Sequence, residues 1–306
     1  MSSDGRPGLP LGVRAVTVTE HRGREGAVGL QRSDWLAEEV PVALVFNGIS
    51  HAVMMASPLD LEDFALGFGL TEGLLLSPDE LYGVDVVPVG DDPHLRDGIE
   101  VQMEVAAACA WRLKDRKRSL EGRTGCGLCG TDSLADVCRP LPTLQPLAVP
   151  LSSLAKAMAQ LRDWQALQQL TGATHAAAFC DLDGEVRLAR EDVGRHNALD
   201  KLVGAMVRAR VNANDGFIAI SSRASFEMVH KTAMAGVSVL AAVSAPTARA
   251  VDTAQSSGLA LAGFVRGNDC VLYTHPERFG IGPDPGSGAV TPRQPTELPA
   301  SQGPRP

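Results

Sequence analysis

The amino-acid sequence predicts an α/β protein, with a smaller β-rich part on the N-terminal side and an α/β part behind it. Residues 13–105 contain stretches in which apolar and polar side chains alternate, as they do in half-buried strands. Residues 151–279 instead alternate short apolar runs with helical patterns, which is typical of an α/β domain. A chain of 306 residues buries about 75% of its unfolded surface, so it needs no disulfide or metal to fold.

The N-terminal part is predicted to contain strands, one tight hairpin and two helices. Asn47-Gly48 joins two apolar runs, which is a strong signal for a hairpin. An apolar helix face follows in residues 59–68, and Ser77 begins a capping box that predicts a second helix start. The predicted strands cover residues 13–19, 40–46, 49–56 and 99–105.

A change of composition separates this part from the next. Residues 111–123 hold six basic and two acidic side chains, and the CxxC sequence TGCGLCG and a proline-rich stretch come after them. The final 27 residues contain seven prolines and five glycines, too little apolar surface to order a chain. We therefore predict a flexible leader (1–12), a β-rich domain ending in the CxxC loop (13–139), an α/β domain (151–279) and a disordered tail (280–306).

The α/β domain is predicted to be a largely parallel sheet with helices on both faces. The continuous apolar runs 217–220 and 237–243 are expected of strands that are buried on both faces. The other predicted strands cover residues 176–180, 186–189, 259–265 and 271–274. The predicted helices cover residues 154–167, 197–210, 226–234 and 247–255.

Charge and hydropathy exclude several classes of protein. The net charge of −8 argues against a general nucleic-acid binder, which needs a broad basic face. The sequence shows no signal-peptide pattern, and its longest apolar run, residues 237–243, is too short to span a membrane. We therefore expect a cytoplasmic protein without membrane contact, whose cysteines act as thiols, metal ligands or catalytic groups rather than disulfides.

Cys126 and Cys129 form the CxxC pair, in a glycine-rich loop that follows the basic run. Neighbouring cations lower the pKa of a thiol and so favour the reactive thiolate. A reactive thiol loop is our preferred interpretation. Half of a zinc site, completed by Cys109 or Cys138, and a thioredoxin-like redox pair are the alternatives. The cysteines in apolar surroundings, predicted to be strands, are interpreted as inert core residues: Cys109, Cys180 and Cys270.

Three further segments carry polar groups that are able to form a site. Residues 190–204 place Glu191, Asp192, Arg195 and His196 at a helix start, although Asn197 as a cap with locally paired charges explains them equally well. Two loops, 221–231 with Arg223 and 244–250, each follow a buried strand and open a helix, as phosphate-binding loops do. Ordinary capping is the alternative, by Ser222, Ser225 and Ser244.

Seven motifs follow one another between about residues 40 and 275. They are LEDFALGFGLTEG (61–73), TGCGLCG (124–130), THAAAF (174–179), REDVGRHNALDKLVG (190–204), SSRASFEMVHK (221–231), SAPT (244–247) and LAGFVRGND (261–269). Together, and in this order, they resemble the formate dehydrogenase accessory sulfurtransferases, the FdhD/NarQ family.

The resemblance implies a cytoplasmic, homodimeric sulfur carrier. Such a protein takes sulfur from a cysteine desulfurase as a persulfide and passes it to the molybdenum bis(guanine dinucleotide) cofactor of formate dehydrogenase. It also implies a three-layer αβα C-terminal domain like the cytidine deaminases, although the sequence lacks the deaminase zinc motif. The resemblance implies that Cys126 carries the persulfide. The alternative is a non-catalytic, zinc-stabilised nucleotide-binding chaperone for a molybdoenzyme.

The cofactor-binding stretch of the family falls on a segment that joins two predicted strands. Its residues are Phe264, Val265, Arg266, Gly267, Asn268 and Asp269. Arg266 between flexible residues is suited to grip a phosphate or to stack on a base. An acidic residue beside a pyrophosphate is unfavourable, so we expect Asp269 to point away.

Overall fold

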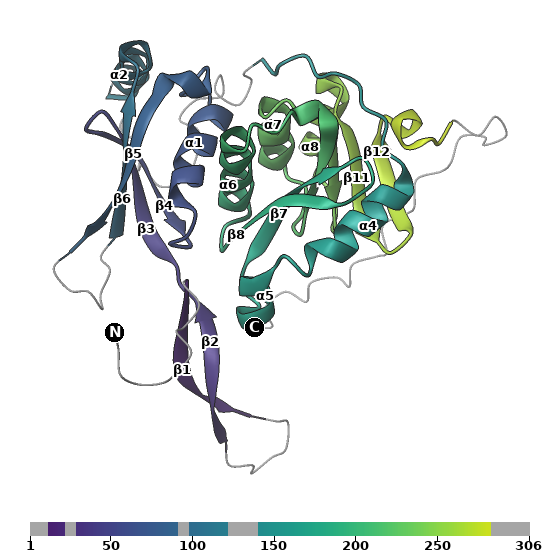
Figure 1. The fold of residues 1–306 in the computed structure, drawn as a ribbon, viewed down its shortest axis with the longest axis horizontal. Helices are drawn as coiled ribbons and strands as arrows, with labels where there is room; N and C mark the ends of the chain where they lie inside the picture. Colours follow the sequence, from purple (N-terminus) through teal and green to yellow (C-terminus); the bar gives the residue numbers. More distant parts are fainter. Residues whose placement is uncertain (1–11, 22–28, 91–97, 122–139, 283–306) are drawn as a thin grey trace, which may run out of the picture.

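The computed structural model of the protein describes residues 12–21, 29–90, 98–121 and 140–282 (Figure 1). The CxxC cysteines, nearly all of the predicted leader and most of the predicted tail lie outside the described residues. The predicted domain boundaries stay predictions. Within the described part, two β-sheets lie on either side of a layer of helices, and no described helix is long and apolar enough to cross a membrane.

A four-stranded sheet with the order β4-β3-β6-β5 forms the N-terminal core, and α1 covers one of its faces. The predicted hairpin is confirmed, since Asn47 and Gly48 have φ angles of 45° and 78°, as a tight turn between twisted strands requires. The elements are β3 (Val40–Phe46), β4 (Ile49–Ala56), α1 (Leu61–Thr71), β5 (Leu81–Val89) and β6 (Gly98–Val105).

A separate two-stranded hairpin projects away from both sheets (Figure 1). Its first strand, β1 (Val13–Glu20), was predicted, and its second, β2 (Leu30–Ala37), was not. The hairpin contacts α5 (Ala166–Thr171) through β2.

The predicted helix start at Ser77 is confirmed, although the helix is short. The Ser77 Oγ accepts a hydrogen bond from the Asp79 N–H at 3.2 Å, Pro78 takes the first position, and the 3₁₀ helix spans only Pro78–Glu80. Strand β5 follows at once, because its valines pair with β6 along the sheet. Residues 111–121 of the basic run instead lie in a helix that sequence patterns did not reveal, α2 (Ala107–Glu121), and the rest of the run lies outside the described residues.

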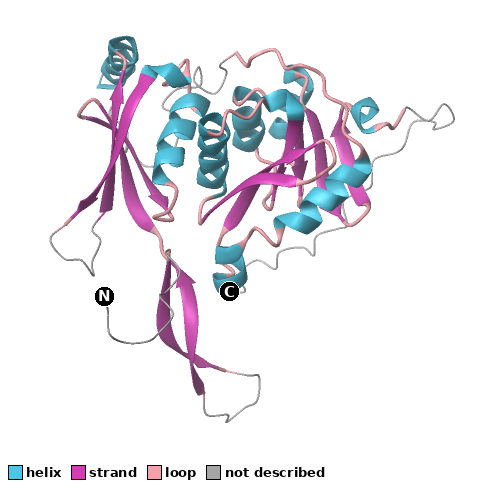
Figure 2. Ribbon diagram, in the orientation of Figure 1, coloured by secondary structure: helices cyan, strands magenta, loops and turns pink. Residues whose placement is uncertain are grey.

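The C-terminal part is a three-layer αβα arrangement around a six-stranded sheet, as expected (Figure 2). Helices α6, α7 and α8 pack on one face and α4 packs on the other. The strands are β7 (His175–Asp181), β8 (Val186–Asp192), β9 (Gly216–Ile220), β10 (Val239–Ala242), β11 (Ala260–Arg266) and β12 (Asp269–Thr274). The helices are α4 (Leu151–Leu161), α5 (Ala166–Thr171), α6 (Arg195–Arg208), α7 (Phe226–Met234) and α8 (Ala248–Ser257).

Two details of this part correct the sequence prediction. The sheet is mixed rather than largely parallel, with the order β12-β11-β10-β9-β7-β8 and parallel pairing only among β9, β10 and β11. Strands β7 and β8, like β11 and β12, are joined by short turns, which only antiparallel neighbours allow. The helix predicted over 154–167 is split in two, as α4 and α5.

The two sheets are joined through α1 and α6, which pack against each other between them (Figure 1). Glycines let the two helix backbones approach closely. A Cβ atom on Gly67 would overlap the carbonyl oxygen of Asp200, and one on Gly204 would overlap that of Asp63. Side chains larger than hydrogen are therefore excluded at both positions.

Candidate functional site

The candidate site lies at the carboxyl end of the parallel strands β9, β10 and β11, where three loops meet. The loop after β9 bonds to the loop after β10, with the Ala224 N–H donating to the Ala245 carbonyl at 3.2 Å. The Phe264 N–H donates to the Ser244 carbonyl at 3.3 Å, which brings in the third segment. Ligands of parallel sheets bind at this edge.

The predicted cofactor stretch forms the end of β11 and its turn into β12. Phe264 is 39% exposed and has a φ of 51°, in the left-handed region that a bulky residue rarely adopts. Arg266, Gly267 and Asn268 are exposed, whereas the Val265 side chain is buried in the core beneath α4. Asp269 is exposed and pairs with Arg266 in the strand register.

Glu191 and Asp192 have structural roles, which resolves part of the ambiguity in residues 190–204. The Glu191 carboxylate accepts hydrogen bonds from the Leu167 and Gln168 N–H groups at 2.8 and 2.9 Å, so it caps α5. Asp192 and Lys201 form a fully buried ion pair of 2.6 Å. These acidic groups are therefore not available to a ligand.

The capping interpretation of this segment is nevertheless wrong for Asn197. Helix α6 begins at Arg195 with Gly194 as its N-cap, so Asn197 lies inside the helix. Its side-chain Nδ2 donates to the Met55 carbonyl at 2.8 Å and to Asp192 at 3.0 Å. Asn197 thus ties α6 to the N-terminal sheet.

Arg195 and His196 face the site from the first turn of α6. The His196 Nε2 lies 2.7 Å from Glu227 Oε2 and 3.4 Å from Ser225 Oγ. The hydrogen bond from His196 lowers the pKa of Glu227. Because one nitrogen serves both contacts, the three residues do not form a nucleophile–base–carboxylate relay, which uses both ring nitrogens.

His175 is a residue of this edge that sequence reasoning missed. It begins β7, next to Asp192 in the strand register. Burial, followed by the positive charges of Arg195 and His196, lowers the pKa of His175 below its ordinary value. The THAAAF motif (174–179) contains His175, but only the folded structure brings this side chain close to α6.

The alternative of serine capping in the two phosphate-loop candidates is not supported. Ser225 is the N-cap of α7 by backbone position, but its side chain makes no capping bond. Helix α8 is capped by Thr247, whose Oγ1 accepts from the Ala250 N–H at 3.3 Å. The Ser222 hydroxyl donates to the Arg223 carbonyl instead. Arg223 itself is exposed at the edge.

Cys109 and Cys180 are buried core residues, although Cys109 lies in a helix and not in a strand, whereas Cys270 is only half-buried beside the core. The Cys109 thiol is buried and donates to the Leu74 carbonyl at 3.2 Å, which weighs against a role as a zinc ligand. Burial raises the pKa of Cys180 and, more weakly, that of Cys270, so both thiols stay protonated at neutral pH.

The fold defines a class of protein: an α/β protein in which a four-stranded sheet is joined through two packed helices to a six-stranded sheet of an αβα arrangement. Comparison with known proteins then identifies the family. The chain belongs to the FdhD/NarQ family, whose sequence pattern matches residues 37–280. This confirms the resemblance found in the sequence.

Individual relatives agree with the family. The chain is 55% identical over 280 residues to the sulfur carrier protein FdhD of Variovorax paradoxus, covering 90% of this chain and 95% of that protein. It is 54% identical over 264 residues to the sulfur carrier protein FdhD of Bordetella petrii, covering 86% and 93%. A formate dehydrogenase accessory protein from Desulfotalea psychrophila has the same fold, with a TM-score of 0.66 and 22% identity over 88% of this chain and 99% of that one.

Proposed function

We propose that this protein is a sulfur carrier for formate dehydrogenase. It accepts sulfur from a cysteine desulfurase as a persulfide on Cys126 and passes it to the molybdenum bis(guanine dinucleotide) cofactor, its cargo, before that cofactor enters the enzyme. The proposal rests above all on relatives of more than 50% identity, over 86% and 90% of this chain, that are named sulfur carrier proteins. We further propose that it works as a cytoplasmic homodimer.

The chemistry uses both thiols of the CxxC pair. The Cys126 thiolate attacks the outer sulfur of the donor persulfide, a new S–S bond forms on Cys126, and the donor cysteine leaves as a thiolate. Release as sulfide requires two electrons. Attack by the Cys129 thiolate on the inner sulfur supplies them, since it leaves a Cys126–Cys129 disulfide that a cellular dithiol then reduces.

The cargo is proposed to bind at the carboxyl edge of the larger sheet, along the stretch from Phe264 to Asp269. Phe264 offers an exposed aromatic ring for stacking on a base. Arg266 offers an exposed guanidinium for a phosphate. Val265 contributes through its backbone, because its side chain is buried.

A labelling experiment tests this function. The protein is incubated with a cysteine desulfurase and free cysteine, alkylated, and mapped by mass spectrometry. We expect the added sulfur on Cys126 and its loss, with loss of formate dehydrogenase activation, in Cys126→Ser. Cys129→Ser keeps the label but releases sulfide poorly, and Cys270→Ser is the control. Label found only on Cys129, or full activity of Cys126→Ser, contradicts the proposal.

A further inference from the structure

Large apolar side chains are exposed around the first turns of α2, at one end of the four-stranded sheet (Figure 1). Trp111 of α2 is 66% exposed, Tyr82 of β5 is 65% exposed, and Leu76, in the turn after α1, is 71% exposed. Among the tryptophan, tyrosine and phenylalanine side chains that the structure describes, Trp111 and Tyr82 are the most exposed. Tryptophan and tyrosine are the residue types that most often dominate the binding energy of protein interfaces.

One ion pair joins the segments that carry these side chains. The Glu80 carboxylate accepts a hydrogen bond from the Leu76 N–H at 2.8 Å and another from the Arg112 guanidinium at 2.6 Å. Arg112 follows Trp111 in α2, and Glu80 lies two residues before Tyr82. The three apolar side chains are therefore carried by segments that are fixed to one another.

Trp111 lies on the outer face of α2. Cys109 and Leu113 are buried and define the inner face of this helix. Trp111 is two residues from each of them, and two residues turn an α-helix by about 200°. Ala107 and Lys114, on the same side as Trp111, are also exposed. The outer face of α2 thus presents an aromatic side chain with a cation beside it.

Charge indicates the kind of partner that fits this face. Helix α2 holds five basic and two acidic residues, a net charge of +3 in a protein whose net charge is −8. An acidic protein surface is complementary to such a helix. In a symmetric dimer centred on this face, two copies of α2 would meet and their positive charges would repel. The charge therefore favours a different protein over a second copy of this chain.

The position of α2 in the chain indicates which protein this is. The helix ends at Glu121, five residues before Cys126, and five residues span at most about 18 Å. A protein bound along α2 is therefore held within reach of the cysteine that, in the proposed function, receives the sulfur. We propose that the outer face of α2, with Trp111, Tyr82 and Leu76, is the docking surface for the sulfur-donor protein, which presents an acidic surface around an apolar contact. The choice of a sulfur donor rests on the proposed function.

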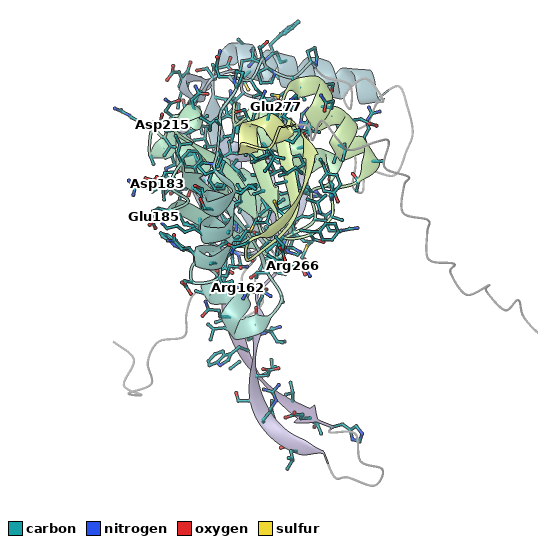
Figure 3. The ribbon with its side chains drawn as sticks, turned by 90° about the vertical axis from the view of Figure 1, so that its right-hand side faces the viewer. Arg162, Asp183, Glu185, Asp215, Arg266 and Glu277 are labelled. Carbon is teal, nitrogen blue, oxygen red and sulfur yellow. The ribbon has the colours of Figure 1, made fainter. Side chains whose placement is uncertain are left out.

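Calorimetric titration of the full chain with a cysteine desulfurase tests the docking surface. We expect Trp111→Ala and Tyr82→Ala each to raise the dissociation constant by about tenfold, as the loss of a central interface side chain does. Lys114→Glu should also raise it, because it places a negative charge opposite an acidic partner. Trp164→Ala is the matched control and should leave it unchanged. Trp164 is 47% exposed and lies two residues after Arg162, which Figure 3 shows in the lower part of the molecule, whereas α2 lies at the top.

The same variants are then labelled with glutathione persulfide, which needs no protein docking. The Cys126 thiolate attacks its outer sulfur and glutathione leaves as a thiolate, so we expect both aromatic variants to be labelled at the wild-type rate. Slower labelling by this small donor would show that the side chains act on Cys126 itself, and would overturn the docking surface.

The binding and labelling results separate this proposal from the sulfur-carrier proposal. Wild-type affinity in both aromatic variants, tighter binding by Lys114→Glu, or no binding of the desulfurase to the wild-type chain overturns the docking surface. Conversion of the aromatic variants from dimer to monomer, measured by light scattering, also overturns it, because the face would then bind a second copy. The sulfur-carrier proposal fails instead if the wild-type Cys126 accepts sulfur from neither donor.

Discussion

The junction between the two sheets and the carboxyl edge of the larger sheet differ in whether their positively charged side chains are paired with carboxylates. At the junction, Lys201 and Lys231 are buried and paired with carboxylates, and Arg190 and Arg208 both bind Asp63. At the edge, five arginines form no ion pair with a carboxylate of the described residues: Arg162, Arg195, Arg223, Arg249 and Arg266. Because a buried charge is tolerated only when it is paired, loss of one partner at the junction would leave a costly unpaired charge in the interior. The unpaired edge charges are available for an anionic ligand.

The junction groups connect segments that are distant in the sequence, either through the ion pair itself or through a further hydrogen bond of the paired residues. The Lys201 Nζ donates to the Ser57 carbonyl at 3.0 Å, and Asp192 accepts from the Ser57 N–H at 3.0 Å. Lys231 contacts Asp200 and Glu72 at 3.0 and 2.6 Å. The N-terminal sheet is therefore fixed to α6 and α7 by specific bonds as well as by apolar packing.

The largest effect is expected from breaking the fully buried pair. Lys201→Met leaves the Asp192 carboxylate buried without its cation, which costs about 3–5 kcal/mol in the free energy of unfolding. Urea unfolding followed by circular dichroism measures it. A loss below about 1 kcal/mol, the typical value of an exposed pair, would contradict a structural role for the junction charges.

Two arginines five residues apart allow a direct comparison of the two regions. Arg190 donates to Asp63 at 2.9 and 2.7 Å, and Asp63 is buried, so Arg190→Ala should cost about 1.5–3 kcal/mol. Arg195 has no acceptor among the described residues, so Arg195→Ala should change stability by no more than about 0.5 kcal/mol. Equal losses in the two variants, measured by the same urea titration, would remove the distinction.

Local sequence patterns predicted much of this fold. Most of the features that they failed to predict depend on contacts between residues distant in the sequence. The hairpin at Asn47-Gly48 and the buried strand β9 follow from residues close in the sequence. The antiparallel pairs at the two edges of the larger sheet result from short turns between consecutive strands. The prediction of a largely parallel sheet rested on strand–helix alternation and did not take these turns into account. The role of Glu191 as a cap for α5 depends on a partner more than twenty residues away. No local pattern could have distinguished that carboxylate from a ligand-binding one.

The same reasoning applies to the candidate site. The loops 221–225 and 263–269 were recognised because each lies next to a predicted strand end. His175 was not, because a lone histidine at a strand start has no distinctive spacing. Its importance comes from Arg195 and His196, which the packing of α6 on β7 brings close to it.

The smallest expected effect is a change in the titration of His175, which reports the unpaired positive charge directly. Burial, and after it the charges of Arg195 and His196, lowers the pKa of His175 below 6.5 in the folded protein. The unfolded chain therefore binds more protons at mildly acidic pH, and this residue's contribution to stability, present above about pH 6.5, is lost as the pH falls through the folded pKa.

Arg195→Ala removes one of the two positive neighbours, so the pKa of His175 should rise towards its ordinary value while the contribution of burial remains. Titration of the His175 ring signal by NMR measures this, with Arg210→Ala as the control that leaves it unchanged. A His175 pKa that is unchanged in Arg195→Ala would show that the charge on Arg195 is already neutralised within the protein. The contrast between the paired junction and the unpaired edge would then be lost.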